Sequence, residues 1–189
     1  MPEPVPERTR HLILDRDGVL NEEAADGGYV CDPEEFRWLP GVLDALARLR
    51  AAGVRVSVAT NQSCVGRGIL SPEGLARVHA RMTRDAEAAG GAIGAIFCCP
   101  HAPDAGCDCR KPAPGLVTAA IRASGIDPRA TLLVGDDHRD LAAGRGAGIA
   151  VALVRTGKGR ATERALSDPR PPVFDDLASI AAAVAGGSP

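Results

Sequence analysis

The stretch H-L-I-L-D-R-D-G-V-L-N, residues 11–21, decides the fold of this chain. A short apolar run that ends in acids and a glycine predicts a strand buried on both faces of a parallel sheet. Asp15 and Asp17 then lie at the carboxyl end of the strand, the edge where open α/β sheets bind their ligands. Two acids at such a place lose hydration and repel each other, so a purely structural role is difficult to support. A carboxylate can act as a nucleophile, for which a phosphoryl group is a suitable target. The alternative is an Asp-rich turn that caps the strand.

Composition limits the classes of protein to consider. A chain of 189 residues predicts one domain, residues 1–189, and 45% apolar with only 3% aromatic residues predicts an aliphatic core. The net charge is −2, which argues against nucleic acid or a membrane surface as partner. No apolar run approaches the ~20 residues of a membrane span. Residues 1–10 lack the apolar segment of a signal peptide, so we expect a cytoplasmic protein, a monomer that acts on a small molecule.

Hydrophobic periodicity predicts strands alternating with helices. Strands are expected at 11–14, 54–59, 95–98, 131–134 and 149–154, with helices at 42–52, 71–89, 114–124 and 176–185 and a short helix before residue 149. Residues 21–38 and 156–172 are expected to form polar loops. This order predicts a single Rossmann-like parallel sheet flanked by helices, with right-handed crossovers and no insertion large enough for a cap domain.

Polar residues at the ends of several strands are expected to converge. Thr60 and Asn61 follow the second strand, Lys111 follows the third, and Asp136 follows the fourth. Acids, a hydroxyl and a cation together are what metal-assisted phosphoryl transfer requires. Mg²⁺ prefers such oxygen ligands, and a Lys and a Thr can hold the equatorial phosphoryl oxygens. Taken alone, Thr60 could also cap a loop, and Lys111 could be an ordinary surface lysine.

Four cysteines crowd between residues 98 and 109, near His101. Cys99, His101, Cys107 and Cys109 supply three thiolates and an imidazole, the ligand set of a closed structural zinc site. Disulfides are the alternative, which the expected compartment disfavours. Zinc would stiffen the loop that carries Arg110 and Lys111. Cys98 should point away from Cys99 and be buried, and Cys31 and Cys64 are expected to be unpaired thiols. A zinc-stabilised nucleic-acid-binding module is the rival class, but one Trp, one Tyr and no basic excess disfavour it.

The motifs resemble those of haloacid dehalogenase (HAD)-like phosphatases. The matching motifs are D-R-D-G at 15–18, Thr60, Lys111 and G-D at 135–136. Further segments are similar to the heptose-bisphosphate phosphatases, close relatives of the histidinol-phosphate phosphatases: Y-V at 29–30, L-P-G at 39–41, T-N-Q-S at 60–63, C-P-H at 99–101 and C-D-C-R-K-P at 107–112. The resemblance implies a HAD fold and a Mg²⁺-dependent hydrolase. It would remove the 7-phosphate of a heptose 1,7-bisphosphate in the synthesis of nucleotide-activated heptose, with histidinol phosphate or another small phosphomonoester as the alternative substrate.

The resemblance also implies roles for individual residues. Asp15 would attack phosphorus and form an aspartyl-phosphate, and Asp17 would protonate the leaving group and then activate water. Asp15, Asp136 and the main-chain carbonyl of Asp17 would hold Mg²⁺, while Thr60 and Lys111 would bind the phosphoryl group.

The rest of the substrate would be bound by a second set of side chains. These are Arg110, Asn61, Gln62, Ser63 and Asp137. Asp140 could support the site from behind, although Asp137 and Asp140 could equally be N-terminal helix charges. His79 and His138 are expected at the surface.

Overall fold

The architecture is a single parallel sheet between two layers of helices. A computed structural model describes residues 5–6, 8–24 and 27–186. The sheet order is β3-β2-β1-β4-β5-β6, and all paired strands are parallel. The strands are β1 (His11–Leu14), β2 (Arg55–Asn61), β3 (Ile96–Cys99), β4 (Thr131–Gly135), β5 (Ala150–Val154) and β6 (Val173–Phe174). The predicted fold class is confirmed.

β1 lies at the centre of the sheet because its side chains are apolar on both faces. Leu14 pairs with Val58 of β2 on one side and with Val134 of β4 on the other. Leu12 and Leu14 belong to the core on one face, whereas Ile13 belongs to the core on the opposite face. This register brings the residue after β1, Asp15, to the same sheet edge as the ends of β2 and β4.

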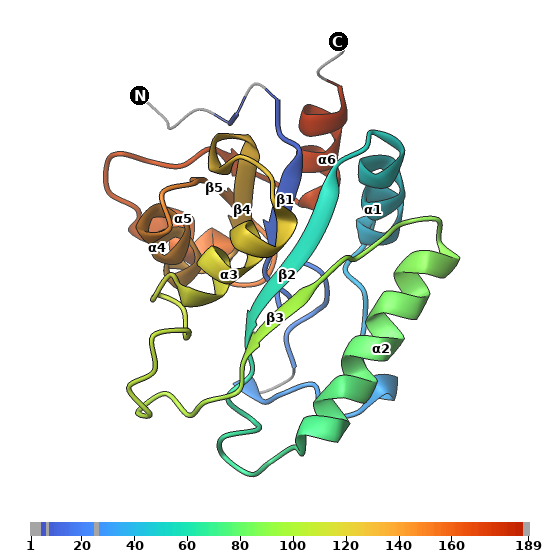
Figure 1. The fold of residues 1–189 in the computed structure, drawn as a ribbon, viewed down its shortest axis with the longest axis vertical. Coiled ribbons are helices and arrows are strands. Elements are labelled where there is room, and N and C mark those ends of the chain that lie inside the picture. The colour runs from blue at the N-terminus through green and yellow to red at the C-terminus, as the bar shows by residue number, and fades with distance from the viewer. Residues whose placement is uncertain (1–4, 7, 25–26, 187–189) are drawn as a thin grey trace.

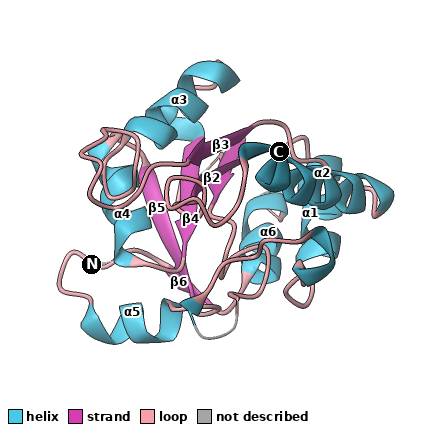
Figure 2. Ribbon diagram, turned by 90° about the horizontal axis from the view of Figure 1, so that it is seen from below, coloured by secondary structure: helices cyan, strands magenta, loops and turns pink. Residues whose placement is uncertain are grey.

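The helices form two layers, which Figure 1 shows on either side of the strands. α1 (Val42–Ala51), α2 (Pro72–Ala88) and α6 (Leu177–Ala185) contribute to the core that contains Leu12 and Leu14. α3 (Gly115–Ser124) and α4 (His138–Gly146) contribute to the core around Ile13. Seen from below, as in Figure 2, the loops that follow the strands gather at the carboxyl edge of the sheet.

The region after β5 differs from the prediction of a polar loop. It contains α5 (Gly159–Ala165) and the short strand β6, which extends the sheet beyond the five predicted strands. The periodicity gave no signal because α5 has no apolar stripe and buries only Gly159. A strand of two residues is likewise too short for an alternating pattern.

Loops alone cover the carboxyl edge in the described part of the chain, as expected without a large cap domain. The segment after β1 contains a short 3-10 helix, η2 (Pro33–Glu35), and is closed at its base by an antiparallel bridge between Asn21 and Trp38. A second 3-10 helix, η3 (Pro128–Ala130), precedes β4. None of the helices within the described ranges is long and apolar enough to cross a bilayer.

Candidate active site

Three carboxylates meet at the carboxyl edge of the sheet. Asp15 follows β1, Asp136 follows β4, and Asp140 lies in the first turn of α4. Each of them offers an oxygen that lies within 4.8 Å of the oxygens of the other two. Asp136 and Asp140 are buried, and the Asp15 side chain is only 15% exposed. Three acids this close repel one another unless cations compensate them.

Lys111 supplies one of these cations from the loop after β3. Its Nζ lies 2.9 Å from Asp15 Oδ1 and 2.6 Å from Asp140 Oδ1, and it donates to the carbonyl of Ala59 at 2.7 Å. Burial by itself would lower the pKa of Lys111, but Asp140 and Asp15 raise this pKa above its usual value. The ammonium is therefore charged, and Lys111 is buried in the site rather than at the surface.

One lysine does not neutralise the cluster. Burial raises the pKa of Asp15 to about 6, against the opposing effect of Lys111. Burial and the Asp15 carboxylate raise the pKa of Asp136 to about 8. Three carboxylates face one ammonium here, and burial makes their unbalanced negative charge costly, which is why both pKa values are raised. A divalent cation with oxygen ligands fits this donor set.

The backbone leaves room for the Asp136 carboxylate. A Cβ added to Gly18 or to Gly157 would lie 2.1 Å or 2.2 Å from Asp136 Oδ2, and both glycines have positive φ. The backbone N–H of Lys158 donates to the same oxygen at 2.8 Å. Only glycine permits this close approach of two loops to a carboxylate.

Asp17 has a different environment, although it lies only two residues from Asp15. Arg16 Nη2 donates to both of its oxygens, at 2.9 and 3.0 Å, and Asn21 Nδ2 donates at 2.9 Å. Gln62 Nε2 adds a donor at 2.8 Å. Burial would raise the pKa of Asp17, but Arg16, Asn21 and Gln62 outweigh it and lower this pKa. Without a substrate, Asp17 is therefore an anion.

The site opens into a cavity of about 300 Å³. Its walls come from all the strand-end loops and from the segment after β1. The lining residues are Asp15, Asp17, Glu23, Ala24, Gly27, Gly28, Tyr29, Val30, Thr60, Asn61, Arg110, Lys111, Asp136, Asp137, Arg139, Asp140 and Lys158. The predicted residues Gln62 and Ser63 are absent from this lining.

The T-N-Q-S segment after β2 makes protein contacts with most of its side chains. Asn61 exchanges two hydrogen bonds of 3.0 Å with the backbone of Lys111, one as donor and one as acceptor. Gln62 donates to Thr60 Oγ1 at 2.9 Å as well as to Asp17. Ser63 Oγ lies 3.0 Å from Tyr29 Oη. These three side chains orient Lys111, Asp17 and the loop of Tyr29 respectively.

Three cations besides Lys111 line the cavity. Arg139 is paired with Asp137 at 2.6 Å, and Lys158 Nζ lies 2.5 Å from Glu23. Arg110 differs, because its Nη1 is buried and has no hydrogen-bond partner among the residues that the structure describes. A buried donor without an acceptor is costly, so Arg110 is the cavity cation best prepared to bind an added anion.

Asp137 and Asp140 form the N-terminal cap of α4. The Asp137 side chain accepts from the backbone N–H of Arg139, and the Asp140 side chain accepts from the backbone N–H of Asp137. Burial would raise the pKa of Asp137, but hydrogen bonds from Arg139 lower it to about 2. Asp140 combines the cap with its contact to Lys111, so the helix-charge and site interpretations both apply to it.

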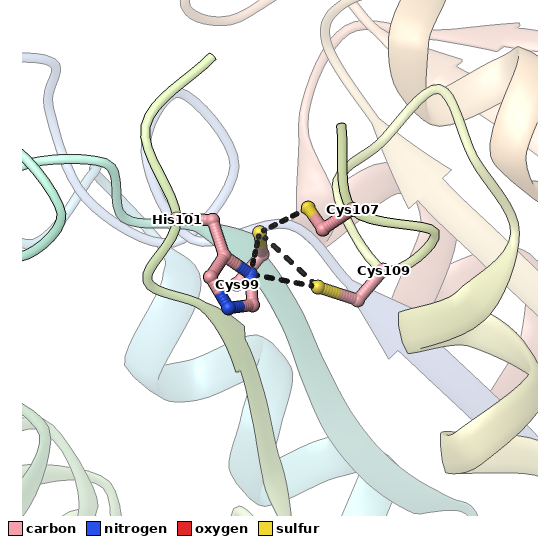
Figure 3. Close-up of side chains that lie close together, drawn as sticks. All are labelled: Cys99, His101, Cys107 and Cys109. Carbon is pink, nitrogen blue, oxygen red and sulfur yellow. Dashed lines mark hydrogen bonds between the residues drawn. The ribbon is translucent and has the colours of Figure 1, made fainter. Parts of the chain in front are cut away.

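The cysteine loop gathers a second cluster, shown in Figure 3. Cys99 Sγ lies 3.6 Å from Cys107 Sγ, 3.3 Å from Cys109 Sγ and 3.6 Å from His101 Nδ1. Cys109 Sγ lies 3.3 Å from His101 Nδ1. Tetrahedral zinc with usual bond lengths places sulfurs about 3.8 Å apart and sulfur and nitrogen about 3.5 Å apart. The four ligand atoms therefore fit a closed zinc site. All six cysteines are free of disulfides.

Two predictions about single side chains were wrong. Cys98 is half-buried rather than buried, because β3 is the edge strand of the sheet. His79 is half-buried and contacts Arg16, whereas His138 is exposed as predicted. Sequence reasoning also missed Arg16 and Asn21 as partners of Asp17. No periodic or spacing signal marks His79, because it meets Arg16 only through the packing of α2.

The fold and the site together define a hydrolase of the HAD-like class. A family model described as HAD-hydrolase-like matches residues 108–180, which contain Lys111, Asp136 and Asp140. Asp15 and Asp17, which follow β1, and Thr60, near the end of β2, lie before this segment.

Comparison with known proteins identifies the family within this class. It is 43% identical over 176 residues to a D-glycero-beta-D-manno-heptose-1,7-bisphosphate 7-phosphatase of Pseudomonas aeruginosa, covering 92% of this chain and 96% of that one. A crystal structure of D,D-heptose 1,7-bisphosphate phosphatase from B. bronchiseptica, complexed with magnesium and phosphate, is 41% identical with a TM-score of 0.90. That match covers 95% of this chain and 100% of the other. The chain belongs to this family of HAD-like phosphatases, and the predicted resemblance is confirmed.

Proposed function

We propose that this phosphatase removes the 7-phosphate of D-glycero-β-D-manno-heptose 1,7-bisphosphate and requires Mg²⁺. The observation that carries the proposal is the set of side chains that line one cavity. Asp15, Thr60 and Lys111 line it as candidate partners of a reacting phosphate, and Arg110 adds a buried donor that has no partner among the described residues. A substrate with two phosphates matches this arrangement. The relatives are named for this reaction, which supports the same choice.

Asp15 is the nucleophile in the first step. One of its oxygens attacks phosphorus, the bond from phosphorus to the sugar oxygen breaks, and an aspartyl-phosphate forms. Lys111 holds Asp15 in place, and Lys111 and Thr60 bind the phosphoryl oxygens on which charge accumulates. Attack requires ionised Asp15, which the ammonium of Lys111 favours against the effect of burial.

Asp17 serves the same step by giving a proton to the leaving sugar alkoxide. The substrate-free chain holds Asp17 as an anion, so this proton must arrive with the substrate. A phosphate monoester has its second pKa near ~6 and can bring the proton as a monoanion. In the second step, Asp17 takes a proton from the water that attacks phosphorus. Inorganic phosphate leaves, and Asp15 is regenerated.

The excess of negative charge around Asp136 points to the site of the magnesium ion. Asp15, Asp136 and the main-chain carbonyl of Asp17 would hold it, with Asp140 acting through Lys111. Bound Mg²⁺ would neutralise charge on the phosphoryl oxygens and on the three acids. The chain supplies few ligands, so water and the substrate phosphate can complete the coordination shell.

Zinc would have a structural role in the second cluster. Cys99, His101, Cys107 and Cys109 would fill all four positions, which leaves none for substrate. The loop that they close ends at Arg110 and Lys111, so zinc would fix the backbone that presents both cations. The product, a heptose 1-phosphate, would keep the anomeric phosphate needed for nucleotide-activated heptose synthesis.

A substrate panel tests the proposed reaction. Phosphate release would be measured with both anomers of heptose 1,7-bisphosphate, with histidinol phosphate and with fructose bisphosphate, in the presence and absence of Mg²⁺. We expect the largest kcat/KM with one heptose bisphosphate and no turnover without Mg²⁺. Faster turnover of histidinol phosphate would overturn the assignment.

Replacing Arg110 tests the contact with the remote phosphate. Arg110→Ala should lower kcat/KM for the heptose bisphosphate by roughly 10- to 100-fold, since remote binding energy also positions the reacting group. Arg110→Lys keeps the charge but not the fork and should lose less. Turnover of 4-nitrophenyl phosphate, which has no second phosphate, is the matched control and should change little. Equal losses on both substrates would show that Arg110 serves the reacting phosphate or the fold of the loop.

A further inference from the structure

Arg16 is a buried cation between the two acids of the D-R-D motif. Its side chain is only 1% exposed. Nε and Nη2 both face Asp17, at 3.2 Å for Nε to Oδ1 and at 2.9 and 3.0 Å for Nη2 to the two oxygens. Nη1, the third nitrogen, points away from this pair toward α2 and lies 3.3 Å from His79 Nε2.

The contact between Arg16 and His79 fixes the state of the imidazole. A guanidinium has only donors, so His79 Nε2 must accept, and the ring proton must be on Nδ1. His79 is therefore neutral in this contact. It is absent from the cavity lining, and the hydrogen bond to Arg16 connects it to a residue beside the site.

His79 has a fixed position because its helix, α2, is held both by buried side chains and by hydrogen bonds near the surface. Val78 and Met82 are fully buried neighbours on the helix. Toward solvent, Asp85 accepts from Arg81 at 2.7 Å and from Trp38 Nε1 at 3.2 Å, which ties the helix to the loop after β1. The acceptor that faces Arg16 thus belongs to a rigid element.

We infer that His79 is a positioning residue for the Asp17 carboxylate, acting through the guanidinium of Arg16. This inference rests on the proposed role of Asp17 as acid and base. The planar fork can present Nε and Nη2 to Asp17 in one orientation only, and the hydrogen bond from Nη1 fixes that orientation. Without His79, a buried donor loses its acceptor, and Arg16 rotates away from Asp17 to find another.

The leaving group of the substrate separates this role from a structural one. A sugar alkoxide is a poor leaving group and needs a proton from Asp17, whereas 4-nitrophenolate leaves without one. We expect His79→Leu to lower kcat/KM for the heptose bisphosphate by roughly 5- to 20-fold, a part of the ~10²–10⁴ that a general acid contributes. With 4-nitrophenyl phosphate the loss should stay below about 2-fold.

Three further variants make the experiment decisive. His79→Gln keeps an acceptor for Arg16 and should restore most of the loss. Arg84→Ala changes an exposed position of the same helix and should have no effect on either substrate. Asp17→Asn should show the same substrate dependence, only larger. Equal losses on both substrates for His79→Leu, or no recovery with Gln, would overturn the inference. If Asp17→Asn itself kept full turnover of the heptose bisphosphate, the proposed function would fail instead.

A measurement on the unmodified chain does not depend on how the variants fold. The ¹⁵N chemical shifts of His79 report which ring nitrogen carries the proton. We expect protonated Nδ1 and unprotonated Nε2 at neutral pH. A proton on Nε2 would exclude the hydrogen bond from Arg16 and with it the positioning role.

Discussion

Two clusters at the carboxyl edge of the sheet could each hold a metal ion, and they are built in opposite ways. The carboxylate cluster of Asp15, Asp136 and Asp140 contains its own cation, Lys111, and opens into the cavity. The cysteine cluster of Cys99, His101, Cys107 and Cys109 brings four ligand atoms to separations of 3.3–3.6 Å. An incomplete ligand set leaves room for a substrate, whereas a complete one stabilises a loop. We therefore propose that the first cluster carries the chemistry and that the second makes its loop rigid.

The two clusters are joined by one short segment. Lys111 belongs to the carboxylate cluster but follows Cys109 by two residues. The backbone of Lys111 is also held by Asn61 at the end of β2. We therefore expect that both the zinc-bound loop and Asn61 hold Lys111 in its position.

The largest expected effect comes from the carboxylate cluster. Asp15→Asn should reduce kcat to below about one hundredth of the wild-type value, because an amide cannot attack phosphorus. Phosphate release measures the rate, and thermal unfolding should show a folded protein. Activity above that level would show that Asp15 is not the nucleophile. The carboxylate cluster would then lose its proposed catalytic role, and the two clusters would no longer differ in that respect.

The cysteine cluster should affect activity less and metal content more. Cys107→Ser should lose the zinc, about one ion per chain by elemental analysis, and lower kcat/KM by roughly 10- to 100-fold. Cys98→Ser is the control, because Cys98 lies on β3 beside Cys99 but outside the cluster, and it should keep both zinc and activity. A zinc-free protein with unchanged melting temperature and activity would contradict a structural zinc, and zinc that replaced Mg²⁺ in turnover would erase the distinction between the clusters.

Asn61→Ala tests how much the hydrogen bonds from Asn61 contribute to the position of Lys111. The loss of two hydrogen bonds to Lys111, each worth about 0.5–1 kcal/mol, should lower kcat/KM by roughly 5- to 30-fold. Arg67→Ala is the matched control, because Arg67 is exposed in the turn after β2 and does not line the cavity. It should change kcat/KM by less than about 2-fold. A loss with Asn61→Ala that exceeds the loss with Cys107→Ser would mean that Asn61, rather than the metal loop, places the lysine.

The smallest effect concerns stability and pH in the metal-free protein. The pKa of Asp136 is raised to about 8, so below pH about 4 this acid is protonated in both the folded and the unfolded state. Between pH about 4 and about 8 the unfolded chain ionises while the folded chain keeps its proton, so the free energy of unfolding falls.

Asp136→Asn removes this titration, and the groups that do not interact with Asp136 contribute equally to both proteins, so their contributions cancel in the comparison. The melting temperature of the variant should therefore rise relative to wild type as the pH increases across this range. Added Mg²⁺ should remove the difference by stabilising the wild type. A difference that stays constant with pH would mean that the pKa of Asp136 is not raised in the folded state.

The strands, their order along the chain and the main site acids could be predicted from the sequence. A buried apolar run followed by Asp15 and Asp17, and glycine-bounded helices between later strands, leave few topologies for a parallel sheet. The spacing of Cys99, His101, Cys107 and Cys109 is equally local. These features depend on neighbours in the sequence, where periodicity is a reliable guide.

Other features arise only from contacts between distant parts of the chain. α5 and β6 carry too little apolar pattern to be detected, and they form because β5 offers them an edge and a surface. Gln62 and Ser63 match a motif for substrate binding, and only the folded structure shows that their side chains contact Asp17 and Tyr29. Their role in substrate binding stays a prediction.

The amino-acid sequence is enough to predict which chemical groups stand at the ends of the strands: two acids after β1, a hydroxyl near the end of β2 and an acid after β4. The environments that distinguish these groups arise from tertiary contacts. Asp15 faces other acids and has its pKa raised, whereas Asp17 faces donors from Arg16, Asn21 and Gln62 and has its pKa lowered. The side chain of His79, 63 residues from Arg16 along the chain, completes that second environment. The physical reason is that pKa values and hydrogen bonds depend on distances of a few ångströms, which the register of the sheet and the packing of the helices fix.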